Sequence, residues 1–140
     1  MKILLSGGTG FIGSALLKRL VEEKHRVILL TRRPESVKHL ARDLVEVEEW
    51  DGKTVGLWAN RVEEIDGVVN LAGESIGAKR WTKSRKELII RSRVEPTKAI
   101  VAAIAMAKKK PAVLVNSSAV GYYGNVESGD AIESHPRGND

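Results

Sequence analysis

Cysteine is missing from all 140 residues of the sequence, which excludes disulfide bonds and thiolate metal sites. No apolar run reaches the roughly 18 residues that a membrane span needs, so we expect none. The three histidines lie far apart and lack the spacing of metal ligands, so we expect no metal centre. The first residues are typical of a strand and not of a signal peptide, which favours a reducing, cytoplasmic location.

Aromatic residues are also few, at 4% of the chain. Apolar residues make up 42% and charged residues 29%, proportions that are ordinary for one globular domain. The net charge of +5 is concentrated in residues 79–93, which hold seven basic residues and one acidic residue. Trp81 is the one aromatic side chain among them, so we expect a solvated helix face and no nucleic-acid partner.

Four glycines fall within seven residues, directly after a short apolar run. Residues 3–6 predict a strand, Gly7, Gly8, Gly10 and Gly13 follow, and an amphipathic stretch begins at once. This order predicts the strand, tight turn and helix start of a dinucleotide-binding βαβ unit. Glycine permits the sharp turn and the approach of backbone to a pyrophosphate. A turn without a ligand is the alternative, but it requires one glycine rather than four.

Strand and helix patterns alternate through most of the chain. Apolar runs predict strands at residues 3–6, 26–31, 44–47, 68–71 and 112–115. Helical spacing predicts helices at residues 11–23, 35–42, 57–64 and 81–107, the last kinked or split by Pro96. Right-handed crossovers then require a doubly wound, parallel α/β sheet of the Rossmann type, with strand order 3-2-1-4-5 and helices on both faces. Residues 116–140 are rich in Gly, Ser, Asn and Asp, which predicts a loop.

Thr31, Arg32 and Arg33 stand where the second strand is predicted to end, about 20 residues past the glycine turn. An Asp or Glu at this point would bond the ribose 2′-hydroxyl of NAD(H) and repel a 2′-phosphate. A hydroxyl and two guanidinium groups favour a phosphate instead, because arginine binds phosphate in bidentate fashion. We therefore predict NADP(H) as the cofactor, with NAD(H) and a solvated basic turn as the alternatives.

Several motifs together resemble one protein family. GGTGFIG at residues 7–13, NLAG at residues 70–73 and SSAVGYYG at residues 117–124 are similar to motifs of the extended and atypical short-chain dehydrogenase/reductases. Within that group the chain resembles the NAD-dependent epimerase/dehydratase family. The combination that resembles an epimerase-like, NADP-binding subfamily consists of NLAGE at residues 70–74, GYYG at residues 121–124 and the pairs at residues 80–81 and 92–93.

The resemblance implies a set of cofactor contacts. They are the pyrophosphate contacts Thr9, Gly10, Phe11 and Ile12, the 2′-phosphate contacts Thr31 and Arg32, the nicotinamide-ribose contacts Leu71 and Ala72, and Arg93 from the long helix.

Two catalytic features of this family are missing. Family members use a tyrosine followed four residues later by a lysine that lowers its pKa, but neither Tyr122 nor Tyr123 has a lysine at that spacing. Ala119 stands in the place of the substrate-polarising Ser or Thr, so Ser118 is the catalytic candidate if the loop is offset. Family members are also longer. We therefore expect residues 1–140 to form the cofactor half alone, truncated after about five strands and inactive by itself.

Two functions from different classes follow from these features. The first is the NADP(H)-binding half of an epimerase/dehydratase-like or reductase-like oxidoreductase, acting on an unidentified small molecule. The second is a non-catalytic NADP(H)-binding or redox-sensing module, which the missing tyrosine–lysine pair favours. An exposed fifth strand would also favour self-association into a homo-oligomer.

Overall fold

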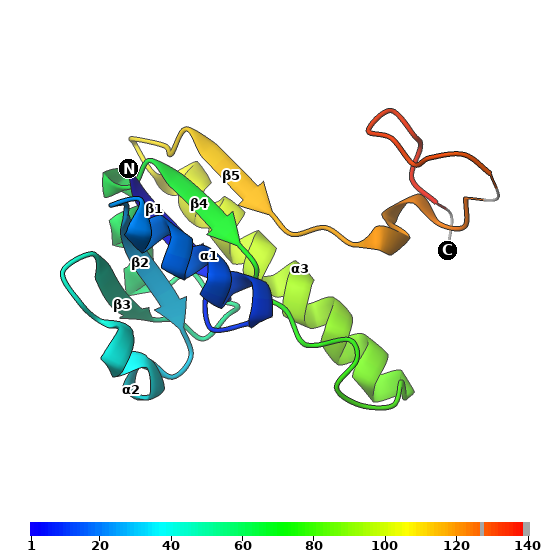
Figure 1. The fold of residues 1–140 in the computed structure, drawn as a ribbon, viewed down its shortest axis with the longest axis horizontal. Coiled ribbons are helices and arrows are strands. Elements are labelled where there is room, and N and C mark those ends of the chain that lie inside the picture. The colour runs from blue at the N-terminus through cyan, green and yellow to red at the C-terminus, as the bar shows by residue number, and fades with distance from the viewer. Residues whose placement is uncertain (127, 139–140) are drawn as a thin grey trace.

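Parallel strands form one sheet in the computed structural model, which describes residues 1–126 and 128–138. The strands are β1 (Lys2–Ser6), β2 (Arg26–Thr31), β3 (Val45–Glu49), β4 (Gly67–Asn70) and β5 (Val113–Asn116). They lie in the order β3-β2-β1-β4-β5, and every neighbouring pair is parallel (Figure 1). The predicted Rossmann-like α/β fold and its strand order are therefore confirmed.

The central strands are buried because helices cover both faces of the sheet. Leu4 and Leu5 on β1, and Ile28 and Leu29 on β2, are fully buried. Side chains of successive strand residues point to opposite faces, so such a strand needs an unbroken apolar run. These apolar runs are the reason that the first two strands were predictable.

Each face of the sheet has its own apolar cluster. On one face, Ile3 and Leu5 contact Leu17 and Leu20 of helix α1 (Phe11–Glu22), next to the short helix α2 (Pro34–Val37). On the other face, Leu4 and Val68 belong to a cluster with residues of helix α3 (Lys83–Met106) and the 3₁₀ helix η2 (Leu57–Glu64). The two layers follow from the change of winding direction after β3, which places β1 and β4 side by side.

Residues 35–42 differ from the predicted single helix. The structure has one turn of α-helix, α2, followed by the 3₁₀ helix η1 (Lys38–Leu40). A segment this short gains little from helix formation itself, so its packing decides its shape. Val37 is buried in the cluster beneath α1, and Leu40 packs against the same cluster.

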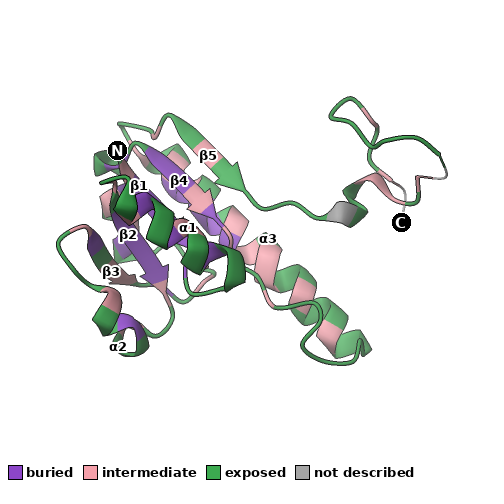
Figure 2. Cartoon of the chain, in the orientation of Figure 1, coloured by how far each residue is buried: buried purple, intermediate pink, exposed green. Residues whose placement is uncertain are grey.

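Helix α3 runs through Pro96 without a break, so of the two predicted outcomes, a kink or a split, the split is wrong. Pro96 is buried together with Ala99, Ile100 and Ala103, and this face anchors the helix to the sheet. A proline removes one intrahelical hydrogen bond, and the packing of the next turns is sufficient to keep the helix continuous. The amino-terminal half of α3 extends past the sheet and is largely exposed (Figure 2).

Strand β5 is an edge of the sheet, as predicted. Val113 and Val115 on this strand are 47% and 50% exposed. The segment after β5 leaves the sheet, passes through the 3₁₀ helix η3 (Val120–Tyr123) and lies to one side of the domain (Figure 1). Self-association through this edge stays a prediction.

Within residues 1–126 and 128–138, no helix combines the length and the apolarity that crossing a bilayer requires. In the same residues, no group of three or more potential metal-ligating side chains gathers at one place.

An ion network ties β3 and Lys2 of β1 to η2. The Arg61 guanidinium donates to the carboxylates of Glu46, Glu48 and Glu64. Lys2 Nζ lies 3.2 Å from Glu46 Oε1 and 2.7 Å from Glu64 Oε2. The hydrogen bond from Arg61 lowers the pKa of Glu46, and hydrogen bonds from Lys2 and Arg61 lower the pKa of Glu64.

We predict that this network makes stability depend on pH in the acid range. A carboxyl whose pKa is lowered by folding stabilises the fold above its unfolded pKa and loses that contribution as pH falls. Arg61→Met should therefore lower the melting temperature at neutral pH, and the difference from wild type should shrink below about pH 4.5. Arg19→Met is the control. It removes an exposed ion pair between Arg19 of α1 and Glu23, the residue after that helix, and should give a small difference. A difference for Arg61→Met that stayed constant down to pH 3 or so would contradict the prediction.

Candidate functional site

A cleft of about 1510 Å³ lies at the carboxyl ends of β1, β2 and β4. In a doubly wound sheet this is the place where the winding direction changes, and ligands bind there. Most of the predicted cofactor residues line it. They are Gly7, Thr9, Gly10, Thr31, Arg32, Arg33, Leu71 and Ala72.

The floor of the cleft is the glycine loop between β1 and α1. Gly7 has a φ of +70°, a conformation that side chains disfavour, and a Cβ there would lie 2.5 Å from the carbonyl oxygen of Leu71. A Cβ on Gly13 would lie 2.2 Å from the carbonyl oxygen of Gly7. Backbone therefore meets backbone on both sides of the loop, and the cleft above the loop stays open.

The amino terminus of α1 faces this loop without a side-chain cap. Gly10 is the N-cap residue and makes no side-chain hydrogen bond to the helix. The Phe11 and Ile12 side chains are 97% and 67% exposed and do not line the cleft. The first turn of α1 instead presents the backbone N–H groups of these two residues to the loop, together with the partial positive charge of the helix end. This arrangement suits an anion such as a pyrophosphate.

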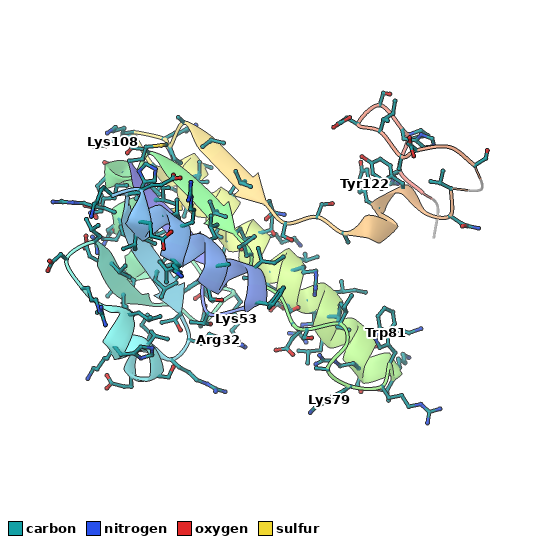
Figure 3. All side chains as sticks on the ribbon, viewed as in Figure 1. Arg32, Lys53, Lys79, Trp81, Lys108 and Tyr122 are labelled. Atoms are coloured by element: carbon teal, nitrogen blue, oxygen red, sulfur yellow. The ribbon has the colours of Figure 1, made fainter. Side chains whose placement is uncertain are left out.

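Cations gather where β2 ends. Arg32 is exposed, and the backbone N–H of Arg33 donates to Thr31 Oγ1 at 3.2 Å. The turn after β3 lies against this point, since a Cβ on Gly52 would be 3.8 Å from Arg32 Cδ. Lys53 of that turn lines the same cleft and lies beside Arg32 (Figure 3).

The turn that carries Lys53 is held by Asp51. Its carboxylate accepts hydrogen bonds from the backbone N–H groups of Lys53 and Thr54 and from the Thr54 hydroxyl, at 2.8–2.9 Å. Burial raises the pKa of Asp51, but these hydrogen bonds lower it by more, so the pKa lies below its ordinary value. The hydrogen bond from the Thr54 backbone N–H has the largest lowering effect. The sequence gives Lys53 no role, because only the folded chain places it beside β2.

A polar network centred on the buried residues Ser6 and Asn70 joins the carboxyl ends of β1, β4 and β5. Ser6 Oγ donates to Asn70 Oδ1 at 2.5 Å, and Asn70 Nδ2 donates to Asn116 Oδ1 at 2.6 Å and to Thr97 Oγ1 at 3.2 Å. Asn70 is 3% exposed, so an unpaired amide here would be costly. The backbone N–H of Ala72 donates to Asn70 Oδ1 at 3.3 Å, which places the nicotinamide-side candidates at the cleft.

Arg93 lies behind the loop that follows β4. Its guanidinium donates to the carbonyl oxygens of Glu74 and Ile89, both at 3.1 Å, and a Cβ on Gly73 would lie 3.2 Å from its Cζ. Arg93 is not among the cleft-lining residues, whereas its neighbour Ser92 is. Its contact with a cofactor stays a prediction, and the contacts present here support the loop.

The structure does not bring Ser118 to the cleft. Ser118 is exposed on the segment after β5 and does not line the cleft. Tyr122, on the same segment, lies well apart from Arg32 (Figure 3). The catalytic role of Ser118 therefore stays a prediction.

A protein-family model and known proteins match most of this chain. The model of the "NAD dependent epimerase/dehydratase family" matches residues 3–139. An epimerase family protein of Staphylococcus saprophyticus is 41% identical over 120 residues, which cover 86% of this chain and 38% of that protein. The chain therefore spans well under half the length of this relative.

Two solved structures carry dinucleotides. The human epimerase family protein SDR39U1, solved with NADPH, aligns with a TM-score of 0.75 at 29% identity over 100% of this chain and 44% of that one. A dTDP-glucose 4,6-dehydratase of Streptomyces venezuelae, solved with NAD, aligns with a TM-score of 0.75 at 25% identity over 99% of this chain and 45% of that one.

We predict that Gly13→Ala destabilises the fold. The added Cβ would overlap the Gly7 carbonyl, and neither backbone segment can move without shifting α1 from β1. The free energy of unfolding in urea should fall by about 1–3 kcal/mol, the scale of an overpacked core. Gly77→Ala is the matched control, because a Cβ there meets nothing within 4 Å, and its effect should stay within about 0.5 kcal/mol. Equal effects of the two substitutions would contradict the proposed close approach.

Proposed function

We propose that residues 1–140 are the NADP(H)-binding half of a protein of the NAD dependent epimerase/dehydratase family. The premise is that this chain belongs to that family. Residues 127, 139 and 140 of that span lie outside the described part of the chain. The glycine loop and the first turn of α1 would hold the pyrophosphate through backbone N–H groups. Leu71 and Ala72 would lie against the nicotinamide-side ribose.

The choice of NADP(H) over NAD(H) rests on the end of β2. None of residues 31–33, where an acid would bond the ribose 2′-hydroxyl, is acidic, and Thr31, Arg32, Arg33 and Lys53 supply a hydroxyl and three cations. A phosphate monoester carries close to two negative charges at neutral pH, and arginine forms paired hydrogen bonds to it. The human relative solved with NADPH supports this choice, while the Streptomyces dehydratase solved with NAD keeps NAD(H) as the alternative.

The bound nicotinamide would supply hydride transfer, and the residues of this chain would bind and orient it. We propose that the whole protein is an epimerase/dehydratase-like or reductase-like oxidoreductase that acts on a small molecule. A non-catalytic NADP(H)-binding module is the second candidate, because no lysine follows Tyr122 or Tyr123 at the family spacing. Hydride exchange with a library of carbonyl compounds, run on the full-length protein, separates the two. A cytoplasmic location and a homo-oligomeric state stay predictions.

We predict that Arg32→Ala weakens NADPH binding and spares NADH. Loss of a charged hydrogen bond to the 2′-phosphate should cost about 1–3 kcal/mol, measured by calorimetric titration with each cofactor. Arg26→Ala is the matched control, because Arg26 is an exposed arginine at the other end of the same strand. It should leave both affinities unchanged. Equal losses for NADPH and NADH in Arg32→Ala would overturn the assignment of Arg32 to the phosphate.

A further inference from the structure

Glu74, in the loop after β4, is held firmly in place at the cleft. Its backbone N–H donates to Ser92 Oγ at 2.9 Å, and its carbonyl oxygen accepts from Arg93 Nη2 at 3.1 Å. Its carboxylate oxygen Oε2 accepts from Arg85 Nη1 at 3.0 Å. The backbone and the side chain are therefore both fixed by α3, and Glu74 lines the cleft.

Arg85 is a buried partner for this carboxylate. Its side chain is only 10% exposed, and its Nη2 donates to the carbonyl oxygen of Ser75. A guanidinium this deeply buried needs an anion, because an unpaired buried charge is costly. The Glu74 carboxylate is thus held in position beside the cleft.

The second carboxylate oxygen of Glu74 faces Arg32. Arg32 Nη2 lies 4.0 Å from Glu74 Oε1, and the Arg32 side chain is 70% exposed. Since β2 and β4 flank β1, this pair spans the carboxyl end of β1, above the start of the glycine loop. One partner is fixed and the other is free to turn, so Arg32 is the side that can change its contacts.

We propose that Glu74 sets the preference between NADP(H) and NAD(H) by competing with the 2′-phosphate for Arg32. The inference rests on the proposed function and deepens it. A 2′-phosphate attracts Arg32 more strongly than the single Glu74 carboxylate 4.0 Å away. To bind Arg32, however, the phosphate must replace that carboxylate as the partner of Arg32, and it then lies near the negative charge of Glu74. NAD(H) brings no competing anion and leaves the pair as it is. The cations after β2 and β3 raise the affinity for NADP(H) above that for NAD(H). Glu74 thereby reduces this difference in affinity.

Glu74→Gln tests the competition directly. Glutamine keeps an oxygen that can accept from Arg85 and removes the charge that attracts Arg32. The NADPH affinity should rise about threefold, the scale of one exposed ion pair, while the NADH affinity stays within about twofold. Because exposed charges are screened by salt, the gain should shrink at high ionic strength. Glu87→Gln, an exposed residue on α3 that does not line the cleft, changes the net charge equally and should change neither affinity.

Each outcome of the titrations decides one point. A selective gain for NADPH supports the role of Glu74, whereas no gain, a loss, or an equal gain for both cofactors overturns it. If circular dichroism shows that Glu74→Gln does not fold, Glu74→Asp draws the carboxylate back from Arg32 by one methylene and should give a gain of the same sign. A wild-type chain that binds neither cofactor refutes the proposed function. A wild-type chain that binds NADPH through Arg32, with no response to Glu74→Gln, refutes only this inference.

Discussion

Backbone atoms of the glycine loop lie closer to α1 and to β4 than any side chain would permit. Gly7 and Gly13 make this approach possible, and every other part of the site is placed relative to it. The approach aligns the first turn of α1 with the cleft and sets the loop against Leu71 at the end of β4. A cleft whose floor is made of peptide groups offers hydrogen-bond donors without competing side chains, which is what a phosphate chain requires.

Two kinds of polar structure surround this floor, and they differ in rigidity. The network around Asn70 has a buried centre, and its hydrogen bonds tie the ends of β1, β4 and β5 to one another. The two charged side chains at the mouth of the cleft, Glu74 and Arg32, also differ in how firmly they are held. Glu74 is fixed by α3, while Arg32 is exposed and pairs at longer range. The mouth of the cleft thus holds an exposed cation with a fixed anion nearby.

Apolar runs and glycine spacing were sufficient to predict the five strands and their order, and most of the predicted cofactor residues line the cleft. The failures are in segments where packing outweighs local preference. Residues 35–42 form two short helices because Val37 and Leu40 must reach the apolar cluster under α1. Pro96 does not divide α3 because the face that follows it is anchored to the sheet. In the site, Lys53 and Glu74 were given no role. Lys53 belongs to no motif, and Glu74 closes the NLAGE stretch at residues 70–74, in which only Leu71 and Ala72 were expected to contact the cofactor.

The sequence by itself determined the strand, loop and helix that open the chain, the cations after β2 and the absence of an acid among them. These are local features, in which neighbouring residues dictate turn geometry and charge. Tertiary structure alone decided which distant residues share the cleft. Lys53 reaches Arg32 because β3 pairs with β2, and Glu74 reaches it because β2 and β4 flank the same strand. Such neighbours arise from strand order and helix packing, which act over dozens of residues and leave no mark in local spacing.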